Sequence, residues 1–362
     1  MRPISIAKIL GLIVLLVPIS AIAADSPDTF PQKQIGIYLN ATNAGDEEFV
    51  SGVIDRLPDR GISALVFYVK GNYVYFDSKS GLANEANLVV PLINLPTLVE
   101  KARSKGIYTI ARYIAVRDKF LGRAFPQTRM SHPETGVALD TDWVHPSHET
   151  VLEYNRQLIG EIAKAGVDEI NLDYIRYPTD ILSSLSSMST GEKIVHLEAF
   201  VRMARRAIDM SGENTKLGIS TYAIIGWYYD STINNIGQDI VRFAPFVDVI
   251  SPMAYPQTFA VGAYFNPAYH PRTREYYLVL RTLEGYIEIL GDHAWKLRPW
   301  IQGYYVDAGD MTEQIAAVYD SGLCGFTVWS AANYYQPLYS SLRTSEIPDR
   351  CSITEKVAQA IE

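Results

Sequence analysis

Short runs of β-branched and aromatic residues recur along the chain, and segments with apolar residues at helical spacing separate most of them. The runs predict eight strands at Ile35–Asn40, Ala64–Lys70, Tyr108–Ala115, Glu169–Arg176, Lys216–Ala223, Asp248–Pro256, Arg298–Val306 and Gly325–Asn333. The segments between them predict helices that include Asp46–Asp59, Leu95–Lys105, His148–Ala165, Lys193–Met210, Tyr276–Leu290 and Thr312–Asp320. Eight strands alternating with helices predict an α/β fold, a single-domain (β/α)8 TIM barrel. A doubly wound open sheet is less favoured, because no Gly-rich dinucleotide loop follows the first strand.

The N-terminus has the pattern of a signal peptide. Arg2 and Lys8 precede an apolar run from Ile9 to Val17, and the small residues of Ala21-Ile22-Ala23 follow it. A membrane anchor is the alternative, but the run is shorter than the roughly 20 residues that a spanning helix needs. We therefore expect a signal peptide over residues 1–24, a flexible lead-in over 25–34, the barrel over 35–345 and a C-terminal tail over 346–362. Removal of the signal would leave no membrane anchor and a secreted or periplasmic protein.

Composition and charge limit the classes of partner and cofactor that we expect. The formal net charge is −8 and no basic stripe is present, so nucleic acid is a poor partner. Neither a His-Glu-x-x-His motif nor a metal-type Cys/His spacing occurs, and we expect no metal or other cofactor. The two cysteines, Cys324 and Cys351, are compatible with a disulfide or with one buried and one free thiol.

Alternation along the fourth strand places a carboxylate inside the barrel. If the apolar Ile170 and Leu172 face the helices, Asn171 and Asp173 face the barrel axis, with Asp173 near the C-terminal end of the strand. Active sites of TIM barrels form at this end. A buried carboxylate is costly unless it is hydrogen-bonded, paired or used. Asp173 is therefore the main candidate for a catalytic residue, and the alternative is a structural aspartate that caps the next loop or pairs with Arg176.

The same alternation gives the barrel a mouth rich in aromatic rings and polar groups. The candidates for substrate binding are Lys70, Arg112, Arg176, Tyr222, Tyr255, Gln302, Trp329 and Asn333. Aromatic rings stack on the apolar faces of sugars, while amide, Arg and Lys groups bond to hydroxyls. The mouth therefore predicts a carbohydrate substrate.

Several segments resemble one family of bacterial proteins. They include Asp173-Tyr174-Ile175-Arg176-Tyr177-Pro178, Ser251-Pro252-Met253-Ala254-Tyr255-Pro256 and Val328-Trp329-Ser330-Ala331-Ala332-Asn333, in this order and well separated. The chain resembles the "putative glycosyl hydrolase domain" family from about Ile35 to Tyr339. The resemblance implies a TIM barrel related to glycoside hydrolases. The chain departs from the family pattern on its second strand, where Tyr68 stands in place of an aspartate.

Glycoside hydrolysis normally requires two carboxyl groups, one acting as acid and the other as nucleophile or base. Asp173 resembles the nucleophile or base of related barrels, and Asp118 is our candidate for the acid, with Asp230 and Asp307 as alternatives. If the acid is missing, the chain is instead a non-catalytic carbohydrate-binding barrel of the cell envelope. The sequence leaves open the sugar, the linkage, the stereochemical outcome and the oligomeric state.

Overall fold

The computed structural model describes residues 33–345, 348 and 351–353 of the 362-residue chain. The predicted signal peptide, all but the end of the lead-in, and most of the C-terminal tail lie outside these residues. No helix in the described part of the chain is long and apolar enough to cross a membrane.

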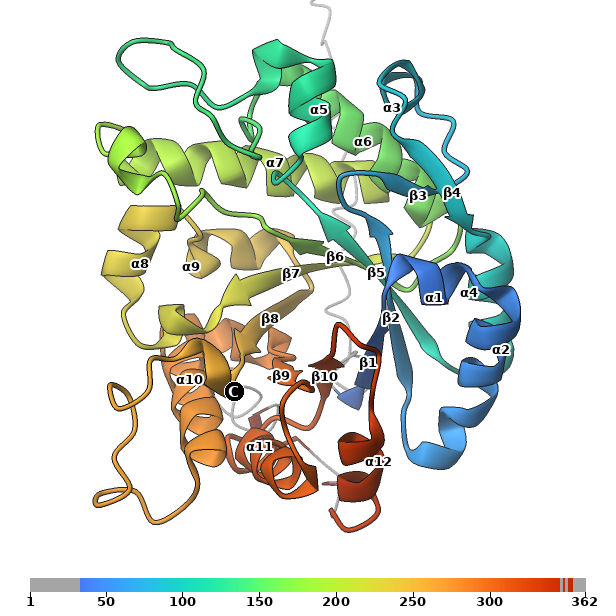
Figure 1. Cartoon of the computed structure of the whole chain (residues 1–362), viewed down its shortest axis with the longest axis vertical. Helices are drawn as coiled ribbons and strands as arrows, with labels where there is room; N and C mark the ends of the chain where they lie inside the picture. The colour runs from blue at the N-terminus through green and yellow to red at the C-terminus, as the bar shows by residue number, and fades with distance from the viewer. Residues whose placement is uncertain (1–32, 346–347, 349–350, 354–362) are drawn as a thin grey trace, which may run out of the picture. The chain divides into compact units, whose positions relative to one another are not determined.

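Eight parallel strands form a closed ring, and Figure 1 shows helices around it. The strands are β1 (Ile35–Leu39), β2 (Ala64–Lys70), β5 (Tyr108–Ile114), β6 (Glu169–Asp173), β7 (Lys216–Tyr222), β8 (Val249–Ala254), β9 (Trp300–Gln302) and β10 (Phe326–Trp329). The ring closes because β1 pairs with both β2 and β10. This confirms the predicted TIM barrel, and all eight strands lie within the predicted ranges.

Two further strands extend the sheet beyond β2. The chain turns back after Lys70, so that β3 (Val74–Phe76) runs antiparallel to β2, and β4 (Val89–Ile93) pairs with β3. Neither strand is predicted from the sequence. β3 buries Val74 and Phe76 but has only three residues, and β4 exposes Val90 and Leu92, so it lacks the buried pattern of the barrel strands.

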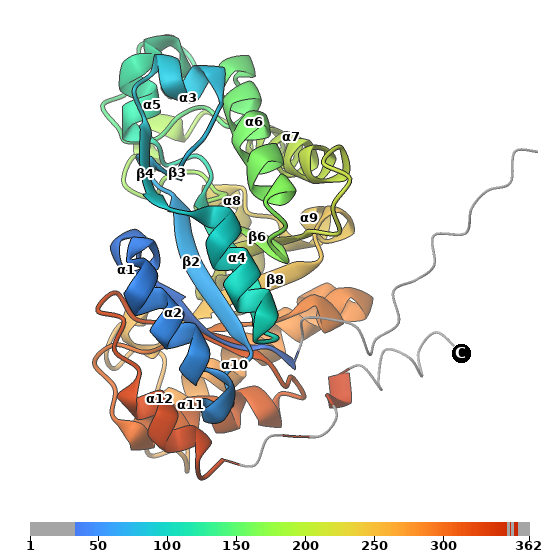
Figure 2. The ribbon, with the colours of Figure 1, turned by 90° about the vertical axis from the view of Figure 1, so that its right-hand side faces the viewer.

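The six predicted helices are present and surround the strands. They are α2 (Glu47–Arg56), α4 (Leu95–Ser104), α6 (Glu149–Lys164), α7 (Thr190–Asp209), α10 (Arg274–Leu290) and α11 (Ala308–Asp320). Figure 2 shows α2 and α4 running alongside β2 in this outer layer. Shorter helices lie in the connections: α1 (Ala41–Gly45), α3 (Gly81–Glu85), α5 (Lys119–Ala124), α8 (Tyr229–Ile236), α9 (Ile240–Phe243) and α12 (Gln336–Leu342).

The strands separate two regions of core. Ile170 and Leu172 are fully buried in the large cluster that includes the outer helices, as their alternation predicts. The barrel interior holds a smaller apolar cluster that includes Tyr38, Val66 and Trp300. Since alternate residues of β6 face inward, polar groups of this strand must find partners inside the barrel. Two such contacts are the buried ion pair between Glu169 and Arg298 (2.7 Å) and the hydrogen bond from Ser220 to Asn171 (2.6 Å).

Helix α10 packs directly against the backbone of a 3-10 turn that follows β7, Ala223–Gly226. A Cβ atom at Gly285 would lie 1.8 Å from the carbonyl oxygen of Gly226, and one at Gly226 would lie 2.5 Å from that of Thr282. The two glycines therefore permit an approach that any side chain would prevent.

The two cysteines form a disulfide, which resolves the two alternatives left open by the sequence. Cys324 and Cys351 have Cα atoms 5.3 Å apart and are separated by 27 positions. Cys324 lies just before β10, so the bond ties residue 351 to the strand that closes the barrel.

Candidate active site

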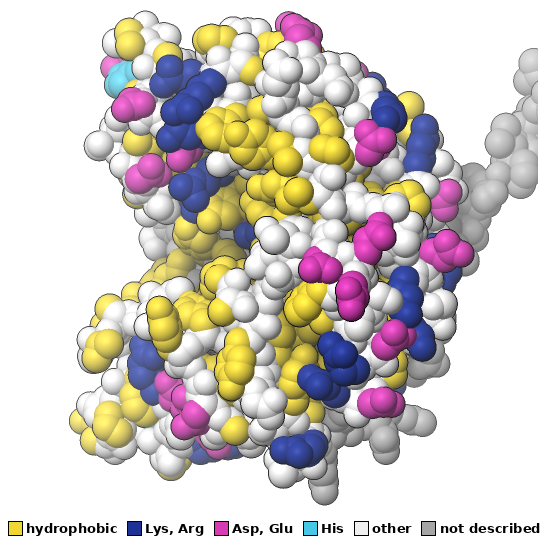
Figure 3. All heavy atoms as spheres, turned by 45° about the vertical axis from the view of Figure 1, so that its right-hand side comes forward, with side chains coloured by type: hydrophobic (Ala, Val, Ile, Leu, Met, Phe, Trp, Pro, Cys, Tyr) yellow, Lys and Arg dark blue, Asp and Glu magenta, His cyan; other side chains and the backbone are white. Residues whose placement is uncertain are grey.

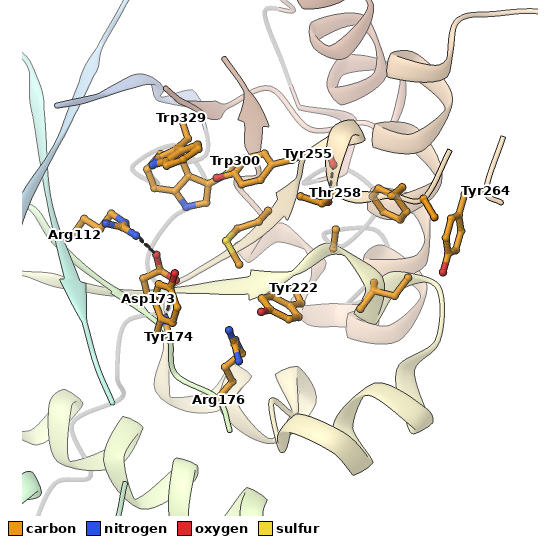
Figure 4. A pocket seen from close by; sticks show the side chains of 15 residues that line it. Arg112, Asp173, Tyr174, Arg176, Tyr222, Tyr255, Thr258, Tyr264, Trp300 and Trp329 are labelled. Atoms are coloured by element: carbon orange, nitrogen blue, oxygen red, sulfur yellow. Dashed lines mark hydrogen bonds and ion pairs between the residues drawn. The ribbon is translucent and has the colours of Figure 1, made fainter. Parts of the chain in front are cut away.

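A pocket of about 660 Å³ opens where β6, β7, β8 and β10 end. Figure 4 shows its lining, which comprises Arg112, Asp173, Tyr174, Arg176, Tyr222, Ala223, Ile224, Met253, Tyr255, Thr258, Phe259, Ala260, Tyr264, Trp300 and Trp329. Most of these side chains are apolar or aromatic. Figure 3 shows a recess on the left of the surface, with hydrophobic side chains lining much of its interior. Pockets that bind organic ligands typically combine such walls with a few polar groups.

Asp173, the last residue of β6, lies at one end of this pocket and is 6 % exposed. Its Oδ2 accepts hydrogen bonds from Nε (3.0 Å) and Nη2 (2.5 Å) of Arg112, which comes from the neighbouring strand β5. Its Oδ1 accepts a hydrogen bond from the backbone N–H of Tyr174 (2.7 Å). These bonds hold the carboxylate in one orientation.

Tyr174 has an unusual backbone conformation, with a φ of 55° in the left-handed region. A non-glycine residue there carries strain of about 1 kcal/mol or more. This turn aims the N–H of Tyr174 at Asp173, and it sends the tyrosine ring toward Trp143, with the ring centroids 5.7 Å apart. The strained backbone of Tyr174 is thus part of the arrangement that orients the carboxylate of Asp173.

Arg112 is held between the carboxylate and two tyrosine rings. Its guanidinium carbon lies 4.9 Å from the ring centre of Tyr68 and 5.6 Å from that of Tyr38. Burial acts to lower the pKa of Arg112, but the charge of Asp173, together with the two tyrosines, outweighs it and raises that pKa above its ordinary value. Arg112 stays charged and neutralises Asp173 in the absence of a ligand.

Aromatic rings line the pocket on two sides. Trp329 stacks on Tyr255 with ring centroids 5.9 Å apart and 28° between the planes. Across the pocket, Phe259 and Tyr264 pack edge to face at 5.2 Å. Burial raises the pKa of Tyr255 well above its usual value, so its hydroxyl remains protonated. The walls therefore offer stacking surfaces and neutral hydroxyl groups, which suit a sugar.

A second, smaller hollow of about 170 Å³ shares Arg112 and Tyr174 with the pocket. Asp142 lines it, and its carboxylate pairs with Lys119 (3.0 Å) and Arg117 (3.6 Å) while its side chain stays 35 % exposed. Asp142 is not among the residues predicted from the sequence, because it lies in an irregular loop where neither alternation nor helical spacing predicts its direction.

Six of the predicted site residues come together. Arg112, Asp173, Arg176, Tyr222, Tyr255 and Trp329 all line the pocket, although they come from five strands or the loops after them. The grouping of the other five agrees with the inward alternation read from the sequence, whereas Arg176 reaches the pocket from the loop after β6, where that alternation no longer applies. The roles of all six in binding or catalysis stay predictions.

The inward orientation expected for Lys70 is wrong, and Asp118, the candidate acid, does not reach the pocket. The register of β2 against β5 shifts between Tyr68 and Lys70, so Lys70 does not follow Tyr68 into the barrel mouth. Lys70 instead pairs with Asp118 (2.8 Å), and both side chains are 0 % exposed. Asp118 also caps α5, accepting a hydrogen bond from the N–H of Leu121 (3.0 Å). Neither residue lines the pocket. Asp118 therefore serves the structure, by pairing with Lys70 and capping α5.

Gln302 and Asn333 also lie outside the pocket lining. Gln302 accepts a hydrogen bond from the N–H of Gln257 (2.9 Å), which holds the loop after β8. Asn333 accepts one from the N–H of Asn40 (3.1 Å) and donates one to the carbonyl of Tyr38 (3.0 Å), which joins the ends of β10 and β1. Both side chains therefore hold backbone segments at the mouth of the barrel and do not face the pocket.

The remaining candidates for an acid lie on the surface. Asp230 is exposed in the first turn of α8, and Asp307 is exposed at the N-terminus of α11, where it caps the helix. Among the described residues, no group of three or more His, Cys, Asp and Glu side chains is placed to hold a metal ion.

Solved structures of several glycoside hydrolases share this fold. The glycoside hydrolase domain of PgaB (BpsB) from Bordetella bronchiseptica is 14 % identical, with a TM-score of 0.66 over 86 % of this chain and 98 % of the other. An endo-beta-1,4-mannanase from Thermotoga petrophila is 13 % identical, with a TM-score of 0.57 over 93 % and 79 % of the two chains. A class V chitinase from Pseudomonas fluorescens is 14 % identical, with a TM-score of 0.54 over 86 % and 99 %. At such identities the likeness shows a common barrel.

The search among curated proteins found no match to this chain. The family comparison is more informative, because residues 36–335 match the family described as "Putative glycosyl hydrolase domain". This agrees with the resemblance read from the motifs around Asp173 and Tyr255. The match covers most of the 362 residues, and the chain therefore belongs to this family of glycoside hydrolase-like TIM barrels.

Proposed function

We propose that this protein is an exported glycoside hydrolase that cleaves a poly- or oligosaccharide, with Asp173 as nucleophile or base. The observation that carries the proposal is the placement of Asp173 at the C-terminal end of β6, inside a pocket with aromatic walls. Family membership supports the reaction class, and the N-terminal pattern supports export.

The proposed chemistry uses the fixed orientation of Asp173. Stacking on the rings of Trp329 and Tyr255 would hold the sugar, while Oδ1 of Asp173, which accepts one hydrogen bond, keeps a lone pair for the anomeric carbon or for a water molecule. Arg112 stabilises the carboxylate form that either role requires.

For the second carboxyl group we propose Asp142 in place of Asp118. Asp142 is the other carboxylate that lines the pocket or the adjoining hollow in the described part of the chain. Its ion pairs with Lys119 and Arg117 lie near the protein surface, where a substrate can replace them. Asp142→Asn is expected to lower turnover while leaving glycan binding in place.

Non-catalytic carbohydrate binding is a second candidate, favoured by one observation. Asp173 is the one carboxylate among the residues that line the larger pocket, and its oxygens already accept three hydrogen bonds. A binding barrel could use the same aromatic walls without an acid.

A panel of polysaccharides, tested with the wild type and Asp173→Asn, separates the two functions. If Asp173 is catalytic, Asp173→Asn should raise the activation free energy by about 4 kcal/mol, which lowers the turnover rate roughly a thousandfold. The substitution also leaves Arg112 without its carboxylate, so some loss of stability is expected in either case. Turnover must therefore be expressed per folded molecule. Asp118→Asn is the matched control, because it removes a buried carboxylate outside the pocket.

The outcomes differ clearly. Cleavage by the wild type, retained by folded Asp118→Asn and lost by folded Asp173→Asn, supports hydrolysis with Asp173 as a catalytic residue. Glycan binding by the wild type without release of reducing ends, across the panel, supports the binding barrel and defeats the hydrolase proposal.

A further inference from the structure

Arg176 is a buried cation that faces the pocket. It follows β6, is 6 % exposed and lies beside Tyr222 and Tyr174, as Figure 4 shows. None of the ion pairs within the described residues involves Arg176, whereas Arg112 pairs with Asp173. A buried guanidinium without a carboxylate partner is unusual, because removing a charge from water is costly unless the charge is compensated.

The protein partners of Arg176 leave most of its hydrogen-bonding capacity unused. One N–H donates to the carbonyl of Tyr177 (2.8 Å), and this is its one hydrogen bond within the described residues. The guanidinium carbon lies 4.4 Å from the ring centre of Tyr222 and 4.7 Å from that of Trp143. A guanidinium has five N–H donors in a fork that matches an oxyanion. The rings hold the fork in place, but they provide no acceptor atoms for it.

The charges in the pocket leave a positive surplus at this position. The charged side chains that line the pocket are Arg112, Asp173 and Arg176, and the first two neutralise each other. The surplus is opposite in sign to the whole chain, whose formal net charge is −8. Burial lowers the pKa of Arg176, and the influence of its neighbours offsets this only in part; these are Tyr222, Asp173, Tyr174 and Asp180. The pocket therefore contains a cation that its own residues do not fully compensate.

A purely structural role explains less of the arrangement. Contacts with aromatic rings recover part of the cost of burying a cation, and one backbone bond recovers a little more. An arginine that only supported the loop could turn toward solvent or pair with an acid. Arg176 instead lines the cavity, and Figure 4 shows its side chain pointing from the loop after β6 toward Tyr222 at the end of β7.

We propose that the pocket takes an acidic glycan, whose carboxylate or sulfate group pairs with the guanidinium of Arg176. This rests on the proposed function only in so far as the pocket binds carbohydrate. An anion would accept the unused N–H groups and cancel the surplus charge, while Tyr222 and Trp143 keep the guanidinium plane fixed. Neutral glycans of the same linkage would leave the charge uncompensated and bind more weakly.

Matched ligands test the proposal on the unaltered protein. The probes are oligosaccharides that contain glucuronate or galacturonate, the same oligosaccharides with their carboxyl groups reduced to alcohols, and sulfated galactan oligosaccharides. Binding is measured by isothermal titration calorimetry. At least one anionic probe is expected to bind roughly 30-fold or more tightly than its neutral counterpart. Comparing the uronate and sulfate arms identifies which anion the pocket accepts.

Three variants locate the effect. Arg176→Gln is expected to remove the preference for the anionic probe, so that the anionic probe binds no more tightly than its neutral counterpart. Arg176→Lys should restore part of the preference, because an ammonium group keeps the charge without the fork. Arg206→Gln is the control, since it removes one positive charge from an exposed position on α7.

Several results would overturn the proposal. They are equal binding of reduced and unreduced probes by the wild type, failure of every anionic probe to bind, and an unchanged preference in folded Arg176→Gln. The wild-type comparison stands even if the variants fold poorly. Binding of acidic probes without cleavage would count against the proposed hydrolase activity and not against this inference. Cleavage of neutral glycans alone would support hydrolase activity and count against this inference.

Discussion

The ion pair between Lys70 and Asp118 is fully buried, so neutralising Asp118 is expected to reduce stability and not turnover. Asparagine keeps the oxygen that caps α5, which accepts a hydrogen bond from the N–H of Leu121 (3.0 Å), so the change removes little besides the charge. Lys70 then keeps a hydrogen bond to the carbonyl of Ile114 (2.7 Å) and lies 5.2 Å from the ring centre of Tyr113. Neither contact supplies a negative charge.

The expected loss follows from the complete burial of both partners, whose Nζ and Oδ2 atoms lie 2.8 Å apart. Breaking a buried pair by removing one partner costs about 3–5 kcal/mol. For a chain of this length, that corresponds to a fall in Tm of roughly 4–7 °C. Burial already lowers the pKa of Lys70, and Asp118 opposes that shift, so Asp118→Asn should lower the lysine pKa further.

Chemical denaturation of Asp118→Asn, Lys70→Met and the double variant measures these losses. Each single variant should be destabilised, and the double variant should recover much of the loss, because replacing both charges removes the desolvation cost as well. Turnover per folded molecule should match the wild type in all three. Lost turnover in an Asp118→Asn protein of unchanged stability would refute this reasoning and return Asp118 to the catalytic candidates.

Two other predictions concern the disulfide and the half-buried His145. Cys351→Ser should lower the free energy of unfolding by up to about 3–4 kcal/mol, because the disulfide closes a loop between cysteines 27 positions apart. Denaturant titrations measure this loss, and an unchanged free energy of unfolding would show that the bond constrains only the tail. Burial, followed by the charges of His196 and His148, lowers the pKa of His145 from 6.5 to about 4, so the folded state binds the proton less readily than the unfolded state. Stability should therefore be full above pH 6.5 and fall by up to roughly 3 kcal/mol as the pH drops toward 4. His145→Asn should flatten this dependence in thermal melts, and equal slopes for the two proteins would contradict it.

The barrel could be predicted from the sequence because its strands carry a strong local signal. Each strand is a buried run between polar segments, and alternation within β6 was enough to orient Asp173. The direction of Lys70 could not be predicted, because a register shift in β2 is decided by pairing with β5. The roles of Asp118 and Asp142 depend on which cation each loop brings near, and a linear sequence does not encode this locally.

The contact between Gly226 and Gly285 makes two adjoining parts of the pocket wall mechanically unequal. The turn that carries Ala223 and Ile224 rests on the backbone of a long helix with no side chain between them, so this part of the wall has no room to retreat. The adjoining part belongs to the loop after β8, whose Phe259 packs in the same apolar cluster as Ala223 but in which Val261 is 94 % exposed and Tyr269 is 80 % exposed. A bulkier glycan would therefore be accommodated by displacement of that loop. Among related barrels, the length of this loop should vary with the size of the ligand.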